Sequence, residues 1–183
     1  MRLLHGVGGL AIVLALGACA ASNSMNGPVA TAYATVEDAA GHRIGVAAFG
    51  QDASGAVNVR MLVHGLTPGM HGVHVHATGS CVAPGFTSAA GHFNPGSTHH
   101  GLNNPLGPHA GDLPNMNVDA AGNADYNATT RHFSLTTGSN SVFDADGSAL
   151  VVHAGPDDNV SDPAGNSGAR VACGVIQSGI APN

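Results

Sequence analysis

Residues 30–64 have the sequence ATAYATVEDAAGHRIGVAAFGQDASGAVNVRMLVH, and this stretch decides the fold class. Apolar and polar residues alternate over 30–37, 43–50 and 56–64, as in strands that bury one face. Between these runs lie the segments Asp38–Gly41 and Asp52–Gly55, which end in glycine and have the composition of hairpin turns. The stretch therefore predicts an antiparallel β-sheet.

The rest of the chain extends this pattern and interrupts it twice. Further strands are expected over 72–76, 115–119, 123–128, 148–153 and 169–176, which brings the total to eight. Residues 81–112 are rich in Gly, Pro, Asn and His and have no usable periodicity, and a second loop covers 154–168. Because a structureless segment of about thirty residues is usually functional or ligand-stabilised, we expect an all-β antiparallel barrel or sandwich with two long functional loops.

The composition excludes some functions and suggests another. The chain has 183 residues, no lysine, five arginines and eleven acidic residues, with a formal net charge of −6. Such a balance argues against nucleic acid as a partner, and against electrostatic binding to anionic lipid. Twelve histidines stand out beside so few charged residues. They indicate metal binding unless they are scattered over the surface, and their spacing has to decide.

The N-terminus has the features of an export signal. Residues 1–18 carry one cation, Arg2, and an apolar run that ends at Leu16, which is too short to cross a bilayer. The run leads into Leu16-Gly17-Ala18-Cys19, which resembles the lipobox of bacterial lipoproteins, in which the cysteine is lipidated. The alternative is an ordinary cleaved signal in which Cys19 is incidental.

Three segments follow from this interpretation. They are a lipoprotein-type signal peptide (1–18), a flexible tether (19–28) and the folded domain (29–183). The protein would be a lipoprotein of the bacterial cell envelope, facing the periplasm, and Ala20 after Cys19 favours the outer membrane. If Cys19 carries lipid, Cys81 and Cys173 remain, either as a pair or as two separate buried thiols.

Two groups of histidines have the spacing of metal ligands. In Gly72-Val73-His74-Val75-His76, residues two apart project from one face of a strand, so His74 and His76 can reach one metal ion. Within the first loop lies a set that suits tetrahedral zinc: His92, His100, His109 and Asp112. The alternative is a polar loop that happens to hold histidines, and His153, taken alone, suits a core histidine.

Six motifs resemble those of the copper–zinc superoxide dismutase family, in the family's order and over essentially residues 29–176. They are Gly72-Val-His-Val-His76, Gly91-His-Phe-Asn-Pro95, His100-Gly101, His109-Ala-Gly-Asp-Leu113, Leu150-Val-Val-His153 and Gly168-Ala-Arg-Val-Ala-Cys-Gly-Val-Ile176. The resemblance implies an eight-stranded Greek-key β-barrel. It also implies an exported enzyme that dismutes superoxide to dioxygen and hydrogen peroxide.

The resemblance assigns a role to each matching residue. The implied copper ligands are His74, His76, His92 and His153. The implied zinc ligands are His92, His100, His109 and Asp112, so that His92 bridges the two metals. Arg170 would attract and hold superoxide, and Asp157 would link His74 to His100. Cys81 and Cys173 would form a disulfide. The family's spacing selects His100 over its neighbour His99, which we expect to be solvated; no role is assigned to His5, His42, His64, His71 or His132.

Two departures from the family pattern bear on how the substrate is guided. The second loop contains no lysine, so Arg170 is the only local cation, whereas three acidic residues lie in the loop: Asp157, Asp158 and Asp162. Weaker attraction of superoxide is therefore expected. Ala164 occupies a channel position where many relatives carry a threonine, which leaves anion selectivity open.

The enzyme hypothesis competes with two others. One is a copper- or zinc-binding envelope lipoprotein without turnover, and the other is a surface module that uses the fold as a scaffold. A metal-buffering relative would be expected to lack a copper histidine or the arginine, whereas this chain keeps them all. The sequence leaves the oligomeric state open between monomer and homodimer.

Overall fold

The computed structural model describes residues 27–182. The expected signal peptide, the expected lipidation site Cys19 and most of the expected tether lie outside the described residues. The strands are β1 (Ala30–Asp38), β2 (Arg43–Gln51), β3 (Val57–Val63), β4 (Gly69–His76), β5 (Asp112–Val118), β6 (Ala124–Thr130), β7 (Ala149–His153), β8 (Arg170–Val175) and the two-residue β9 (Gln177–Ser178). Within this range the one helical element is a 3-10 turn at Thr87–Ala89.

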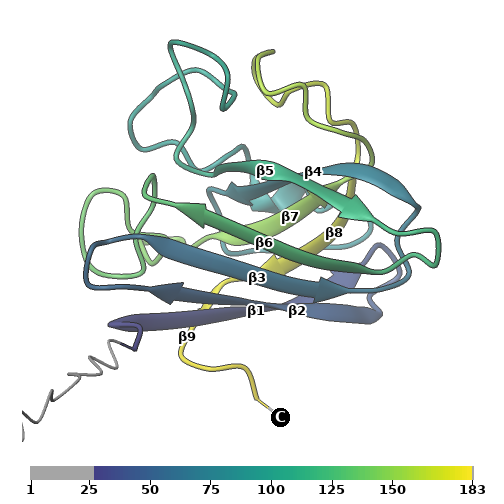
Figure 1. Ribbon diagram of the computed structural model, residues 1–183, viewed down its shortest axis with the longest axis horizontal. Helices are drawn as coiled ribbons and strands as arrows, with labels where there is room; N and C mark the ends of the chain where they lie inside the picture. Colours follow the sequence, from purple (N-terminus) through teal and green to yellow (C-terminus); the bar gives the residue numbers. More distant parts are fainter. Residues whose placement is uncertain (1–26, 183) are drawn as a thin grey trace, which may run out of the picture.

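The strands form a nearly closed antiparallel barrel, as expected (Figure 1). Their order is β5-β4-β7-β8-β1-β2-β3-β6, and β9 pairs with β1 beside this path. The connections from β3 to β4 and from β6 to β7 join strands that are not neighbours. They therefore cross the barrel, as Greek-key connections do.

Alternation of side chains explains how the hairpins form. In β3, Val57, Val59, Met61 and Val63 are buried, while the residues between them are exposed. β3 pairs residue for residue with β2, from Gly45–Val63 to Gln51–Val57. The turn before β2 is held by Asp38, whose carboxylate oxygen accepts hydrogen bonds from the amides of Ala40 and His42, each 2.9 Å long. The pattern of residues 30–64 thus produces the expected sheet.

Two strands begin well before their predicted starts, whereas the other predicted ends agree within two residues; the short β9 was not predicted. β4 begins at Gly69 and β5 at Asp112, each three residues earlier than expected. The two strands pair with each other from Gly69–Val118 to His74–Asp112, and this partnership extends both of them. Asp112 is therefore the first residue of a strand. The polar residues before it gave no sign that a strand begins there.

The centre of the barrel wall supports the histidines. β4 and β7 pair from Val73–Val152 to His76–Ala149, and all five residues of β7 are buried. Val73 and Val75 lie in the main hydrophobic core. The first long loop (residues 77–111) and the second long loop (residues 154–169) lie on the same side of the barrel, in teal and yellow-green in Figure 1. The opposite face of β4, which carries His74 and His76, is buried as well.

A disulfide joins Cys81 to Cys173, with the Cα atoms 5.7 Å apart. The bond ties the start of the first long loop to β8. Cys173 packs in a small apolar cluster with Phe86, Ala89 and Val151. The disulfide thereby fixes the segment around Phe86, to which Arg170 is hydrogen-bonded.

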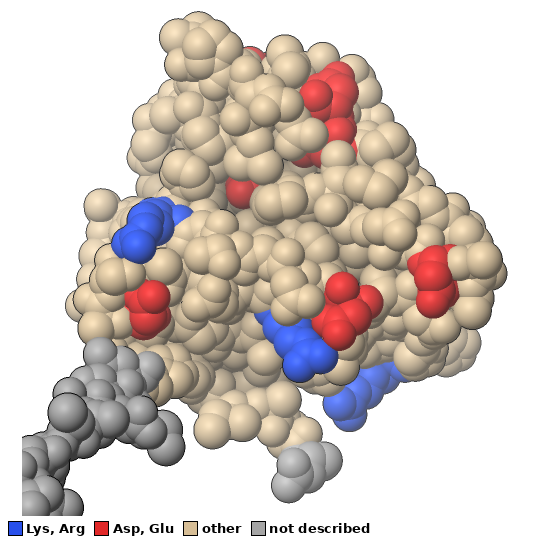
Figure 2. Space-filling model, in the orientation of Figure 1, with Lys and Arg blue, Asp and Glu red and all other residues tan. Residues whose placement is uncertain are grey.

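The described surface carries little charge. On the face shown in Figure 2, arginine and acidic side chains lie as separate groups and form no continuous patch. One surface pair, Arg60 and Asp125, is joined across β3 and β6 at 2.9 Å. None of the described residues forms a helix of the length and hydropathy needed to span a bilayer.

Candidate metal centre

Four histidines meet beside β4 and β7, and we call them the strand-side set: His74, His76, His92 and His153. Each offers a ring nitrogen, and these four atoms lie within 4.8 Å of one another. β4 supplies His74 and His76, and β7 ends at His153. His92 comes from the first long loop, which an isolated β-bridge to His76 holds against β4. Three of the four ligand positions are therefore set by strand pairing.

Hydrogen bonds determine which nitrogen of each ring is left free. The Nδ1 atom of His76 donates to the carbonyl of Ala90 (3.0 Å), and Nδ1 of His153 donates to that of Gly168 (3.1 Å). Their Nε2 atoms remain, 3.4 Å apart. Nδ1 of His74 and Nε2 of His92 are buried without any hydrogen-bond partner. Such orphaned polar atoms are costly, and a bound cation would satisfy all four lone pairs together.

A second group surrounds one carboxylate oxygen, and we call it the loop-side set: His92, His100, His109 and Asp112. The Oδ1 atom of Asp112 lies 2.9 Å from Nδ1 of His92, 3.1 Å from that of His100 and 3.5 Å from that of His109. The Nδ1 atoms of His92 and His109 are 3.3 Å apart. A tetrahedral zinc site with bonds of about 2.0–2.1 Å has ligand edges of about 3.4 Å. The measured separations match those edges.

His92 belongs to both sets, through different nitrogens. Its Nδ1 atom faces Asp112 in the loop-side set, and its Nε2 atom is the orphaned one of the strand-side set. His74 also lies within 4.8 Å of His92, His100 and Asp112. However, its Nε2 atom already donates to Asp157, and its free nitrogen is Nδ1, so we group it with His76 and His153.

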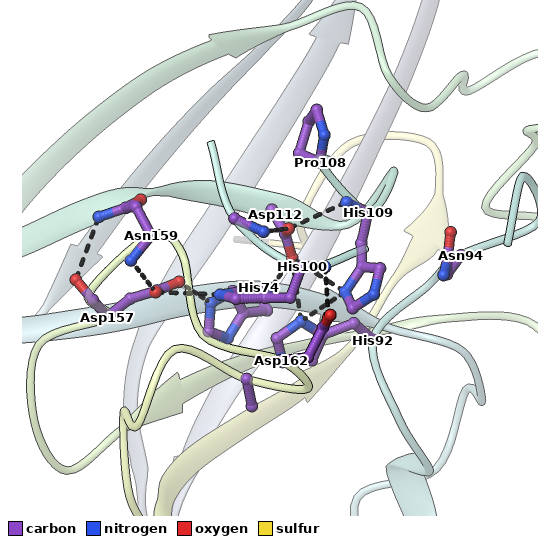
Figure 3. A network of polar contacts seen from close by, with 12 residues as sticks. His74, His92, Asn94, His100, Pro108, His109, Asp112, Asp157, Asn159 and Asp162 are labelled. Carbon is purple, nitrogen blue, oxygen red and sulfur yellow. Dashed lines mark hydrogen bonds and ion pairs between the residues drawn. The ribbon is translucent and has the colours of Figure 1, made fainter. Parts of the chain in front are cut away.

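Two buried carboxylates hold the rings in place (Figure 3). Asp157 accepts from Nε2 of His74 (2.7 Å) with one oxygen and from Nε2 of His100 (3.0 Å) with the other. Asp112 uses its second oxygen to accept the amides of Gly101 (2.8 Å) and His109 (3.0 Å). Carboxylates in such positions fix the tautomer and orientation of metal-binding imidazoles.

Burial keeps the imidazoles of His74, His76 and His153 neutral. It lowers the pKa of His74 to about 3, against the opposing hydrogen bond to Asp157. It lowers the pKa of His76 to about 2 and that of His153 to about 4. Neutral imidazole is the form that binds a metal, so these three are ready as ligands at neutral pH.

The loop-side set is governed by its carboxylates instead. Burial alone would lower the pKa of His100, but its hydrogen bonds with Asp112 and Asp157 outweigh burial and raise the pKa to about 9. Burial would raise the pKa of Asp112, yet hydrogen bonds from His100, His92 and Gly101 hold it far below its usual range. In the metal-free protein this set therefore contains an ion pair at neutral pH.

Arg170 is fixed close to the strand-side set. Its guanidinium donates to the carbonyl of Phe86 (2.6 Å) and to that of Ala90 (2.5 Å). The carbonyl of Ala90 also accepts Nδ1 of His76. Phe86 and Ala90 both have a positive φ, of 53° and 62°, and Phe86 is in the left-handed helical region. The first long loop thus aims two carbonyl groups at Arg170 and connects it to a strand-side ring.

The remaining histidines are exposed, buried or outside the described residues. His99 is exposed and its Nδ1 atom contacts Asp162, whereas its neighbour His100 is buried and faces Asp112. His42, His64 and His132 are exposed, and His5 lies outside the described residues. His71, which sequence reasoning left without a role, is buried, with Nδ1 placed 2.6 Å from the carbonyl of His153 and Nε2 2.8 Å from that of Thr67. The predicted strand over 72–76 excluded His71, which belongs to β4 only because this strand begins at Gly69.

Comparisons with known proteins identify the family of the chain. Residues 43–176 match the family model described as copper/zinc superoxide dismutase. The chain is 44% identical over 147 residues to superoxide dismutase [Cu-Zn] 1 of Aquifex aeolicus, covering 79% of this chain and 86% of the relative. The crystal structure of a SOD-like protein from Bacillus subtilis superposes with a TM-score of 0.75 at 38% identity, covering 78% of this chain and 96% of the other. For the Cu/Zn superoxide dismutase from Brucella abortus the TM-score is 0.66 at 30% identity, with 80% and 99% covered.

Proposed function

The chain belongs to the copper/zinc superoxide dismutase family, and from this premise we propose which side chains carry the reaction and where the enzyme works. It is an oxidoreductase that uses copper and zinc to dismute superoxide to dioxygen and hydrogen peroxide. The observation that carries the residue assignment is the pair of orphaned nitrogens, Nδ1 of His74 and Nε2 of His92. Both belong to the set of four rings beside β4.

We assign copper to the strand-side set and zinc to the loop-side set. Imidazole nitrogens suit copper, and three rings that burial keeps neutral offer them without loss of a proton. Three imidazoles and one carboxylate at tetrahedral edge distances suit zinc. His92 would serve both metals, since its orphaned Nε2 atom belongs to the strand-side set and its Nδ1 atom faces Asp112 in the loop-side set.

Copper supplies the one-electron redox chemistry when bound, and the protein manages protons and anions around it. His92 is the proposed proton carrier, because its Nε2 atom is buried and has no other partner. It would take up one proton there in one half of the cycle and give it to the product peroxide in the other, and water would supply the second proton of hydrogen peroxide. Asp157 keeps His74 and His100 in fixed tautomers meanwhile.

Arg170 is the proposed binding residue for superoxide. Guanidinium stays protonated at any pH of interest, and two carbonyls hold it in one place. Replacing Arg170 with glutamine should lower the dismutation rate about tenfold or more, since a short-range hydrogen bond from a charged donor to the bound anion is worth about 1.5–3 kcal/mol. Copper content should stay unchanged, because no metal-ligand position is altered. An unchanged rate in that variant would remove Arg170 from the mechanism.

The metal-binding lipoprotein without turnover is the less favoured alternative. All members of both sets and Arg170 are present, and named dismutases are among the relatives. A superoxide-dismutation assay on the mature protein, loaded with copper and zinc to measured full occupancy, separates the two. Activity at full occupancy supports the enzyme, and absence of activity there would support metal buffering.

We further propose that the enzyme is a lipoprotein of the bacterial envelope. Support comes from Leu16-Gly17-Ala18-Cys19 and from the disulfide, which needs an oxidising compartment. Mass spectrometry of the mature protein should find a lipid on Cys19 and no residues before it. A mature chain that starts elsewhere, or an unmodified Cys19, would contradict the anchor. Light scattering of the same preparation decides between a monomer and a homodimer.

A further inference from the structure

The two long loops are joined most closely around His100. Nε2 of His100 donates to Asp157, and the amide of Asn103 donates to the carbonyl of Asn159 at 3.0 Å. Asn104 donates to the carbonyls of His100 (2.9 Å) and Val160 (3.2 Å). A segment of five residues in the first loop is thus fastened to the part of the second loop that begins at Asp157.

Asp162 contributes two contacts to this junction from the second loop. Its Oδ1 atom accepts the backbone amide of His100 at 2.6 Å, and its Oδ2 atom contacts Nδ1 of His99. Both contacts are to the first loop, although Asp162 is more than sixty residues away in the sequence. Figure 3 labels Asp162 in the same network of polar contacts as His100.

The backbone of His100 needs such support. The first long loop has no strand partner around His100, and Gly101, which follows it, has a φ of +109°. The Nδ1 atom of His100, the ring nitrogen nearest the backbone, faces Asp112 and is the one proposed to bind zinc. A shift of the His100 backbone would therefore displace this nitrogen relative to Asp112. Asp157 restrains only the far side of the ring.

We propose that Asp162, with His99 as its partner, is a positioning residue that holds the backbone of His100 so that its ring meets the loop-side zinc. This inference rests on the proposed zinc assignment. It explains the role of His99, which is exposed and is not one of the proposed ligands. It also explains why Asp162 is present in a loop where a negative charge repels the superoxide anion. Asp162 belongs to neither metal-binding set and acts through the backbone of His100.

The chain offers a matched control for the test. Asp158 lies in the same loop, is exposed, and accepts the amides of Val160 (2.9 Å) and Ser161 (2.8 Å) and the side chain of Asn166 (2.8 Å). All of these partners belong to the second loop itself. Asp158→Asn therefore removes one charge and weakens the second loop without touching the first.

The experiment measures zinc release from the full mature protein with a chromophoric chelator, for the native chain, Asp162→Asn, His99→Ala and Asp158→Asn. Outer partners of metal ligands are typically worth about 10–100-fold in affinity. We expect Asp162→Asn to release zinc at least about tenfold faster, His99→Ala a few-fold faster, and Asp158→Asn within about twofold of the native rate.

Cobalt in place of zinc gives a second readout. Its visible spectrum reports the ligand geometry, which loosening of the second loop alone would not change. The spectrum should shift in Asp162→Asn and stay native in Asp158→Asn. If Asp162→Asn does not fold, His99→Ala tests the inference instead, because it removes only an exposed ring. The same two measurements, zinc release and the cobalt spectrum, apply to it.

Three outcomes are informative. Native zinc release and a native cobalt spectrum in Asp162→Asn would overturn the inference. Equal effects in Asp162→Asn and Asp158→Asn would also overturn it, because they would show general loosening of the loop. If the native protein holds no zinc at this site, the zinc assignment itself is wrong, which is visible before any variant is made.

Discussion

The strand-side and loop-side sets hold their imidazoles by different physical means. The strand-side rings of His74, His76 and His153 are attached to β4 and β7, and burial lowers their pKa. The loop-side ring of His100 comes from the irregular first loop, and two carboxylates raise its pKa. The strands of the barrel therefore position the strand-side set. The loop-side set depends on its carboxylates and on contacts between the two loops.

The largest predicted effect is acid instability of the metal-free protein. The pKa of His74, His76 and His153 lies well below the ordinary value of 6.5 in the folded state, so the unfolded chain binds more protons below that pH. Each ring then removes up to about 1.4 kcal/mol of stability per pH unit as the pH falls from 6.5. Urea unfolding of the metal-free protein should show a loss of several kcal/mol by a pH of about 4.5.

His100 acts in the opposite direction. Its folded pKa is raised to about 9, so its stabilisation is complete below 6.5 and disappears as the pH rises through 9. The stability of the metal-free protein should therefore be greatest near neutral pH. A stability that stays flat between a pH of about 4.5 and neutral would contradict the neutral, buried state assigned to the strand-side rings.

The second effect concerns the contact between the loops. Gly165 has a φ of +60°, and a Cβ atom there would overlap Oδ1 of Asp157 and lie 2.8 Å from Nε2 of His100. Gly165→Ala should cost the zinc-loaded protein roughly 2–3 kcal/mol, from left-handed strain of about 1–2 kcal/mol and the displaced carboxylate. Thermal unfolding measures this loss.

Gly155→Ala is the matched control for that variant. Gly155 lies in the same loop, has no positive φ, and its nearest atom would be 3.6 Å from the added Cβ. Its unfolding temperature should stay close to native. Equal destabilisation by the two alanines would mean that the contact of Gly165 with Asp157 has no special importance.

The third effect is the pH dependence of zinc binding. His100 must lose its proton to bind zinc, and its pKa in the metal-free protein is about 9. Zinc affinity should therefore fall about tenfold, or about 1.4 kcal/mol, for each pH unit below 9. Isothermal titration calorimetry in buffers of different ionisation enthalpy should show close to one proton released from His100 at neutral pH. Release of no proton would contradict the raised pKa.

The smallest effect concerns guidance of the substrate. The second loop carries Asp157, Asp158 and Asp162 and no lysine, so Arg170 is the cation that faces the strand-side set. We expect the dismutation rate to fall less than about twofold between about 10 and 150 mM salt, because little long-range attraction is present to be screened. Pulse radiolysis over that range measures it, and a steep decline would indicate a stronger field than these residues provide.

Sequence reasoning predicted the barrel because its signals are local. Alternation in residues 30–64 and the Asp-to-Gly turns act over a few residues, and strand pairing followed them closely. The strand-side pair of His74 and His76 could be anticipated for the same reason, since side chains two apart share a face. The early start of β5 at Asp112 was missed, because it depends on its partner strand β4.

What the sequence determined by itself was the fold class, the positions of the loops and the residue types available to bind metal, since these depend on periodicity and composition. The tertiary structure alone decided which nitrogen of each ring is free, that two carbonyls fix Arg170, and that Asp162 reaches back to His99 and His100. These features join residues far apart in the chain, and no local pattern records the distance between them. The physical reason is that burial and hydrogen bonding set tautomer and charge, and both exist only after the barrel has brought the two loops together.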